Sequence, residues 1–311
     1  MKTVGIIGGS GFIGSYVTKK FLDENFKVKV SSTDIGNKSK YEHLQGLNNA
    51  ENLEICALDL RNIDTIAAFV TGCDIVVHGG TPFQLDIKDP EKELFEPTVK
   101  GTENFLAIIK DIPGVEKVVF IASVAAWNTS FPMAPATYKA DHIFSENDTP
   151  YYQENDHPYA QAKFLADKAV RKFTNENPGL NFEIVTISPT WVIGKALSGR
   201  QDSTSIGLQY LFKNKIAPNP FVEMLFATDV VFSMVDVRDV ADAVFNAATI
   251  KGLHGKNYLV ANESYKISDI TLMLNQQPAP SDAAYIYNNA LAKTDLGIEF
   301  IKARDTLNNC D

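Results

Sequence analysis

Three glycines spaced three residues apart, Gly8, Gly11 and Gly14, stand near the amino end of the chain. An apolar run at residues 3–7 precedes them, and apolar residues at helical spacing follow over residues 12–24. A missing Cβ permits a tight turn and close approach of the backbone to a phosphate, and a helix amino end offers unpaired N–H donors. The pattern predicts a strand, a dinucleotide-binding turn and a helix. The residues of this segment expected to bind the cofactor are Gly8, Ser10, Gly11, Phe12, Ile13 and Gly14.

The same order of elements recurs along the first 190 residues. Short apolar runs at residues 26–30, 53–58, 74–78, 117–122 and 182–187 indicate strands. Helical spacing at residues 63–70, 90–110 and 157–174 separates most of them. Strands that alternate with helices predict an α/β protein with a doubly wound parallel sheet, the Rossmann fold.

The second half of the chain is less regular. Residues 194–229 and 252–311 mix glycine, proline and serine with short apolar runs. We therefore expect a dinucleotide-binding Rossmann domain at residues 1–190, to which residues 230–250 return. Residues 191–229 and 251–311 are expected to form a smaller, discontinuous C-terminal lobe that binds the substrate.

The charge of the chain argues against a polyanionic partner. Lysine and arginine total 29 against 38 aspartate and glutamate residues, a formal net charge of −9, so nucleic-acid binding is not expected.

Three cysteines, with no metal-ligand spacing or disulfide framework, fit a reducing cytoplasm. No apolar run has membrane-spanning length, and no signal peptide is expected. His78, His142 and His157 are expected to be structural and no metal site is predicted; a homodimer is possible.

A tyrosine and a lysine stand one helical turn apart in the helix predicted at residues 157–174. Tyr159 and Lys163 would share a face of it, and an ammonium beside a phenol is expected to lower the phenol pKa. Tyr159 could then exchange a proton with a substrate oxygen near neutral pH. Ser123 follows a buried strand, at the carboxyl edge of the sheet where ligands bind. It is expected to contact the carbonyl oxygen of the substrate that Tyr159 protonates. The predicted catalytic residues are Ser123, Tyr159 and Lys163.

With these motifs the chain resembles the extended short-chain dehydrogenase/reductases of the NAD-dependent epimerase/dehydratase superfamily, in particular the dihydroflavonol reductase and cinnamoyl-CoA reductase branch. Further matching segments lie at residues 59–60, 77–82, 96–102, 188–194 and 236–241. The resemblance implies that Asp59 and Leu60 contact adenine and that Pro189 borders the nicotinamide. It also implies that Gly79, Gly80 and Thr81 line the cofactor groove, and that Tyr159 and Lys163 contact the cofactor.

The residues after the second strand favour NADP(H) over NAD(H). Ser32 and Thr33 can hydrogen-bond a phosphate, and Lys40 occupies the place of a phosphate-binding residue of the branch. Thr33 stands where the branch commonly has arginine, which removes one support for NADP. Asp34 could instead bond the ribose hydroxyl of NAD.

The expected activity is reduction of an aldehyde or ketone by hydride transfer, with Tyr159 as proton donor. Phe83 and Trp127 are candidate pocket residues, with Phe131 and Tyr138 as weaker candidates. Residues 127–156 are long and rich in proline and aromatic residues, so a flavonoid substrate is not inherited from the resemblance. Two alternatives stay open: a nucleotide-sugar epimerase or dehydratase with tightly bound NAD, and a non-catalytic nucleotide-sensing protein.

Overall fold

A parallel sheet forms the centre of the molecule. The computed structural model describes residues 1–79, 88–135, 137–139, 141–200 and 203–310. Within them, seven strands pair in the order β3-β2-β1-β4-β5-β6-β9, and every neighbouring pair is parallel. The strands are β1 (Thr3–Ile7), β2 (Lys27–Ser32), β3 (Leu53–Ala57), β4 (Ile75–His78), β5 (Lys117–Ile121), β6 (Glu183–Pro189) and β9 (Asn257–Val260). The predicted doubly wound α/β fold is confirmed.

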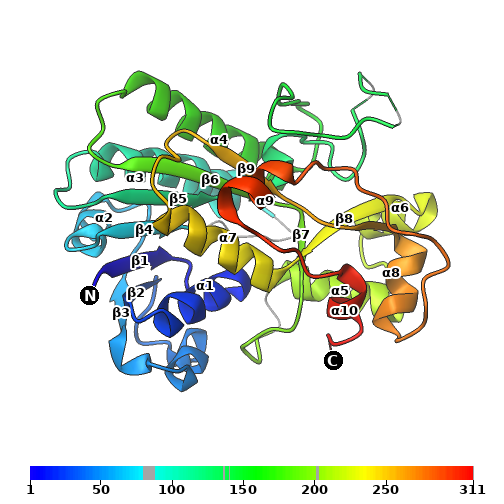
Figure 1. Cartoon of the computed structure of the whole chain (residues 1–311), viewed down its shortest axis with the longest axis horizontal. Coiled ribbons are helices and arrows are strands. Elements are labelled where there is room, and N and C mark those ends of the chain that lie inside the picture. The colour runs from blue at the N-terminus through cyan, green and yellow to red at the C-terminus, as the bar shows by residue number, and fades with distance from the viewer. Residues whose placement is uncertain (80–87, 136, 140, 201–202, 311) are drawn as a thin grey trace.

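Helices cover both faces of this sheet (Figure 1). One face carries α1 (Phe12–Asp23), α7 (Val237–Thr249) and α9 (Ala290–Leu296); the other carries α2 (Ile63–Val70), α3 (Gly101–Ile109) and α4 (Pro158–Glu176). Each layer buries apolar side chains against the strands. Phe21 of α1 is fully buried and meets the rings of Phe26 and Phe245 edge to face, with centroids 5.1 Å away in both cases. Phe105 of α3 is fully buried on the opposite face.

The single helix expected at residues 90–110 is divided in the structure. Residues 91–100 wind as a wider π-helical segment, η4 (Glu91–Lys100), before α3 begins at Gly101. Pro97 lies inside η4 and has no N–H to donate, so regular α-helical hydrogen bonding cannot pass through it. The periodicity of apolar residues predicted one continuous helix over residues 90–110 and did not reveal the π-helical segment.

A smaller lobe packs at one end of the main sheet (Figure 1). Its sheet has the order β10-β8-β7, in which β8 runs parallel to β7 and antiparallel to β10. Its elements are β7 (Trp191–Ile193), β8 (Val231–Asp236), β10 (Ser264–Lys266), α5 (Thr204–Asn214), α6 (Pro220–Thr228), α8 (Ile267–Leu274) and α10 (Ala303–Leu307). Short 3-10 turns complete the described chain: η1 (Lys38–Lys40), η2 (Glu42–Gly46), η3 (Ala50–Asn52) and η5 (Val124–Ala126).

Two segments lie in a different sheet from the one that the sequence boundaries imply. β9 falls within the predicted substrate lobe but extends the main sheet, where Tyr258 pairs with Ile187. β8 falls within the segment expected to return to the main domain but pairs with β7, Val235 opposite Val192. The chain crosses between the sheets at β6 to β7, at β8 to α7 and at β9 to β10.

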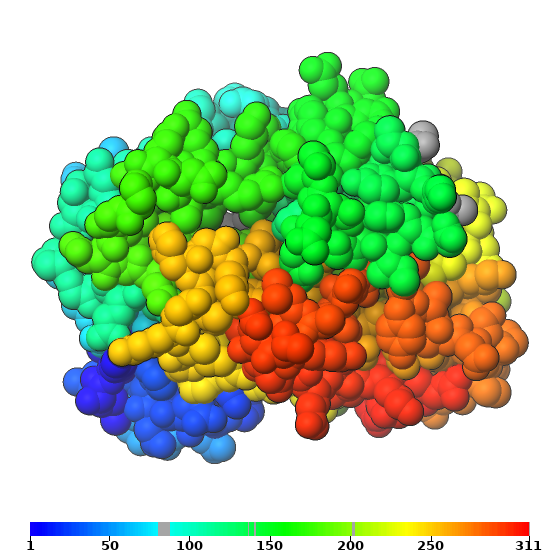
Figure 2. All heavy atoms as spheres, turned by 45° about the horizontal axis from the view of Figure 1, so that its top comes forward, coloured from blue at the N-terminus to red at the C-terminus, as the bar shows by residue number. Residues whose placement is uncertain are grey.

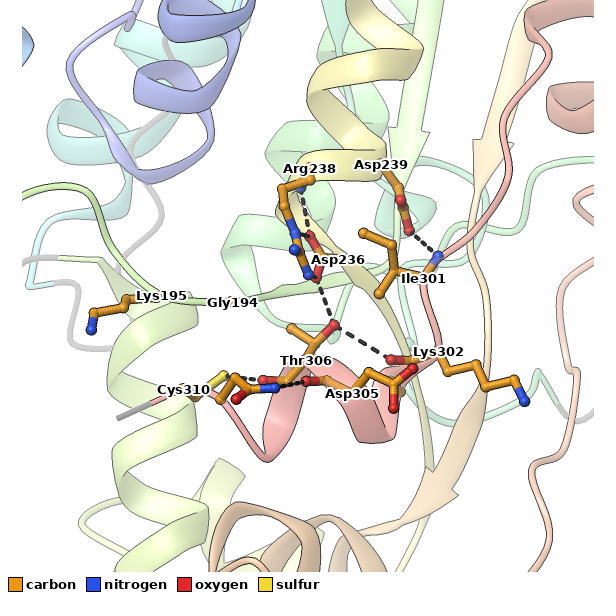
Figure 3. A network of polar contacts seen from close by, with 12 residues as sticks. Gly194, Lys195, Asp236, Arg238, Asp239, Ile301, Lys302, Asp305, Thr306 and Cys310 are labelled. Carbon is orange, nitrogen blue, oxygen red and sulfur yellow. Dashed lines mark hydrogen bonds and ion pairs between the residues drawn. The ribbon is translucent and has the colours of Figure 1, made fainter. Parts of the chain in front are cut away.

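A polar network attaches the C-terminal helix to the junction of the two sheets (Figure 3). Asp236, at the end of β8, forms an ion pair with Arg238 at 2.6 Å and accepts a hydrogen bond from the Thr306 hydroxyl of α10 at 2.6 Å. Asp239 accepts the backbone N–H of Ile301 at 3.0 Å. The motif at residues 236–241 therefore anchors the last segment of the chain.

The C-terminal segment also adjoins residues 127–156 on the face seen in Figure 2. The backbone N–H of Phe144 donates to the carbonyl of Ile286 at 2.9 Å, and the rings of Phe144 and Tyr287 stack with centroids 5.4 Å apart. This aromatic and proline-rich segment is thus tied to the small lobe rather than projecting freely.

Candidate active site

The glycine turn between β1 and α1 leaves the helix amino end uncovered. Gly8 has φ +80°, and Gly11 caps α1 without any side-chain hydrogen bond. A Cβ on Gly14 would stand 2.0 Å from the carbonyl oxygen of Gly8, so glycine is required for the helix to approach the turn. Ser31 braces the turn by accepting the Gly8 N–H at 2.9 Å. These uncapped donors fit the diphosphate of a dinucleotide.

One cavity gathers residues from the carboxyl ends of β4, β5 and β6. It lies near the point where the strand order reverses, between β1 and β4, which is the usual ligand position in such sheets. Its volume is about 160 Å³. The predicted site residues that line it are Ile13, Gly79, Ser123, Tyr159, Lys163 and Pro189. Gly80, Thr81 and Phe83, also predicted, lie outside the described residues.

The helix α4 presents Tyr159 and Lys163 toward this cavity. It begins at Pro158, whose fixed φ suits a first helical turn. The Lys163 ammonium donates to the carbonyl of Ile121 at 3.2 Å and lies 6.0 Å from the centroid of the Tyr159 ring. The Ser123 hydroxyl accepts the N–H of Ala125 at 3.1 Å and hydrogen-bonds the Tyr159 phenol. Ser123 therefore caps η5 and faces the phenol at the same time.

Burial, rather than the neighbouring cation, dominates the acidity of the phenol. Burial raises the pKa of Tyr159, and the hydrogen bond from Ser123 only partly opposes that rise. The sequence interpretation, in which the lysine lowers this pKa, is therefore wrong for this structure. The ammonium donates to the carbonyl of Ile121, and desolvation of the phenol outweighs the hydrogen bond that lowers its pKa. Burial likewise lowers the pKa of Lys163 to about 8.

A buried carboxyl, missed in the sequence, continues the row along α4. Asp167 lies one turn beyond Lys163, is 3% exposed, and has its pKa raised to about 6 by burial. It forms an ion pair with Arg171 at 3.0 Å, and its charge favours the protonated form of Lys163. The signal was present as a third polar residue at four-residue spacing after Tyr159 and Lys163.

His78 packs close to this row. Its ring lies between those of Phe105 and Phe120, at 4.9 and 5.2 Å, and burial lowers its pKa to about 4. Among the described residues, no group of three His, Cys, Asp or Glu side chains is arranged to hold a metal ion.

Polar side chains follow β2, the strand beside β1 in the main sheet. The Lys40 ammonium donates to the Thr33 hydroxyl at 3.3 Å, so these two predicted residues meet. The Ser32 hydroxyl donates to the carbonyl of Asp34 at 2.9 Å. The Asp34 carboxylate accepts the N–H of Gly36 at 2.9 Å, within its own loop.

A cation from a distant segment joins this cluster. The Arg200 guanidinium donates to the carbonyl of Lys40 at 2.9 Å, and its charge adds to burial in lowering the pKa of His43. The same segment is fixed to α1, because the Tyr16 hydroxyl donates to the carbonyl of Lys195 at 2.7 Å. Sequence reasoning missed Arg200, because 160 residues separate it from Lys40 and no pattern links the two.

Other predicted residues have different surroundings. Asp59 pairs with Arg61 at 2.7 Å just after β3, and Leu60 is buried with its carbonyl accepting the Asn104 amide at 3.1 Å. Trp127 is not among the residues that line the described cavity. Its indole packs in a cluster with Phe144 and Tyr287, and the Arg171 guanidinium lies 5.7 Å from the ring.

Three phenylalanines supply the aromatic wall instead. Phe131, a weaker candidate from the sequence, lines the cavity together with Phe221 and Phe232 of the small lobe. Tyr138, the other weaker candidate, packs 4.3 Å from the His142 ring outside this wall. The small-lobe phenylalanines could not be chosen from sequence because their approach depends on how the lobe folds back.

The model of the NAD dependent epimerase/dehydratase family matches residues 4–261. The chain belongs to this family. Among curated members, cinnamoyl-CoA reductase CAD2 of Medicago truncatula is 29% identical over 278 residues, which cover 88% of this chain and 80% of that protein. An anthocyanidin reductase ((2S)-flavan-3-ol-forming) of Vitis vinifera is 26% identical over 280 residues, 89% of this chain and 81% of that protein.

Similar proteins of known structure have the same fold. Yeast methylglyoxal/isovaleraldehyde reductase Gre2, in complex with NADPH, superimposes with a TM-score of 0.81 at 25% identity, covering 99% of this chain and 96% of the yeast protein. The predicted branch, and with it the prediction of an NAD(P)-dependent oxidoreductase, is confirmed by these relatives. In the part of the chain that the structure describes, every helix is too short or too polar to cross a membrane.

Proposed function

We propose that this protein is an NADP(H)-dependent carbonyl reductase in which Tyr159 gives a proton to the oxygen of an aldehyde or ketone. One observation carries the proposal: Tyr159, Ser123 and Lys163 line the same cavity as Ile13 of the dinucleotide turn. When bound, a reduced nicotinamide supplies a hydride to the carbonyl carbon.

Four residues of the chain would donate the proton, orient the donor and set its electrostatic environment. A phenol with a raised pKa keeps its proton at neutral pH, which is the form that a reductase needs as a proton donor. Ser123 orients the phenol from one side. Lys163 is a buried ammonium one turn along α4, and Asp167 favours its charged state.

The preference for NADP(H) is supported by the cluster at the end of β2. Thr33 and Lys40 meet there, and Arg200 supplies a guanidinium beside Lys40, although the chain lacks the arginine of related reductases at position 33. A group of cations in a chain of net charge −9 suits a phosphate on the adenosine ribose. The Asp34 carboxylate is engaged by Gly36, which makes it a weaker partner for a ribose hydroxyl.

The test is carbonyl-dependent consumption of NADPH by the purified protein, with the alcohol product identified by chromatography. Tyr159→Phe should lower kcat by at least about a hundredfold, because it removes the proton but little volume. Tyr210→Phe, at a tyrosine that is 60% exposed, is the matched control and should leave kcat unchanged. Full turnover by Tyr159→Phe would contradict the proposal. Cofactor that copurifies and survives conversion of a sugar nucleotide would support the epimerase alternative instead.

A further inference from the structure

The cavity beside Tyr159 has a mainly apolar wall. The aromatic and aliphatic residues that line it include Phe131, Trp191, Val192, Leu208, Phe221 and Phe232. Such a wall selects an apolar substrate body by burial, but it does not by itself orient the molecule. Orientation requires a polar contact in addition to those made to the reacting oxygen.

His157 adds a polar side chain to this wall. It precedes α4 and lines the cavity, and its ring lies 6.1 Å from that of Phe221. Its Nδ1 atom accepts the backbone N–H of Tyr159 at 3.2 Å. An imidazole nitrogen that accepts a hydrogen bond carries no proton, so the neutral ring has its proton on Nε2. Burial lowers the pKa of His157, which keeps the ring neutral near pH 7.

Two residues of the same wall each have a fully buried polar atom without a partner among the described residues. The Thr190 hydroxyl and the Trp191 indole N–H have no hydrogen-bond partner within the described chain, and these residues are 6% and 4% exposed. The described residues likewise give the Nε2 atom of His157 no partner. Buried polar groups are nearly always hydrogen-bonded, so the Nε2–H of His157, partnerless in the described part of the cavity wall, is complementary to a ligand that brings an acceptor oxygen.

We propose that His157 is a specificity-determining residue whose Nε2–H donates to a second oxygen of the substrate. The preferred substrates are then apolar carbonyl compounds with an acceptor oxygen close to the reacting carbonyl, such as aryl diketones and keto esters. This inference rests on the proposed carbonyl reductase activity. It assigns His157 a role besides capping α4, because the cap uses Nδ1 and leaves Nε2 for the substrate.

The experiment compares two ketones that differ in one oxygen, 1-phenylpropane-1,2-dione and propiophenone. His157→Ser keeps a residue that caps a helix well but removes the ring and its Nε2–H. We expect kcat/KM for the dione to fall about three- to tenfold through a higher KM, while kcat/KM for propiophenone changes less than about twofold. An unchanged melting temperature would show that the cap is preserved.

The outcomes separate the two proposals. If wild-type protein reduces both ketones and His157→Ser lowers both equally or neither, the role of His157 is wrong and the reductase activity stands. Loss of the preference in Thr190→Val, but not in His157→Ser, would assign the second oxygen to Thr190 and overturn the inference. An enzyme that reduces other carbonyls but neither ketone also overturns it. Failure to consume NADPH with any carbonyl refutes the proposed function itself, and the inference with it.

Discussion

The two parts of the candidate site, the phosphate end around the glycine turn and Lys40 and the Tyr159 end around the cavity, differ in their electrostatics. At the phosphate end, glycine backbone and partly exposed cations meet, and the contacts are hydrogen bonds from N–H groups and from Lys40 and Arg200. At the Tyr159 end, Lys163 and Asp167 are buried, Tyr159 is partly buried, and each has its pKa moved by desolvation. The first end thus presents positive charge and backbone N–H groups, whereas the second gathers groups whose protonation depends on burial. Substitutions at the phosphate end should therefore change nucleotide affinity, whereas substitutions at the Tyr159 end should change the pH dependence of the reaction.

The largest effect is expected from Gly14→Ala at the phosphate end. The new Cβ would lie 2.0 Å from the Gly8 oxygen, so the turn must open and the donors at the start of α1 must shift. Loss of two hydrogen bonds to a charged diphosphate corresponds to about a hundredfold weaker NADPH binding, measured by calorimetry. Gly207→Ala is the control, because its Cβ would meet nothing within 4 Å. Equal affinities for the two variants would contradict a phosphate role for the turn.

A smaller effect at the same end should distinguish NADPH from NADH. Arg200→Gln removes the guanidinium beside Lys40, and we expect about tenfold weaker binding of 2′,5′-ADP with little change for 5′-ADP. Lys195→Gln removes a charge from the same segment, where only the backbone carbonyl is bonded to Tyr16, and serves as the control. Parallel losses for both nucleotides would mean that Arg200 acts on the fold rather than on the ribose phosphate.

At the Tyr159 end the effect should appear as a shift in pH dependence. Lys163 has its pKa lowered to about 8, so kcat/KM should fall as pH rises above that value and the ammonium loses its proton. Asp167, with a pKa raised to about 6, is ionised between the two values and stabilises the ammonium. Asp167→Asn should therefore move the alkaline limb to lower pH, by up to about one unit.

The matched control for that shift is Glu176→Gln, which removes an exposed carboxylate at the end of the same helix. Its profile should overlay that of the wild type. An alkaline limb that stays in place in Asp167→Asn would leave Asp167 as a purely structural partner of Arg171.

The predictability of each end follows from how far apart its residues are in sequence. The glycine turn, and Tyr159 with Lys163, are local patterns whose spacing fixes their placement on a helix. Arg200 and Phe232 reach the groove only through the fold of the small lobe, and no local pattern carries that information. Trp127 was misplaced for a related reason, since the direction of its side chain depends on the turn after Ser123.

The direction of the pKa shift of Tyr159 also could not be predicted without the structure. The sign of the Tyr159 shift depends on the balance between desolvation and a cation several ångströms away, and that balance requires coordinates. The winding of η4 around Pro97 and the pairing of β9 with β6 could not be predicted from the sequence for another reason. Both involve segments too short or too irregular for periodicity to resolve.

The late position of β9 has a consequence for synthesis of the protein. Residues 257–260 close the outer edge of β6, whose side chains Ile184, Val185 and Ile187 are buried. Until those residues leave the ribosome, β6 presents a row of unsatisfied backbone groups beside an apolar surface, the arrangement through which strands of separate chains associate. A nascent or shortened chain that ends before Asn257 thus exposes an aggregation-prone edge strand, which β9 covers in the complete sheet.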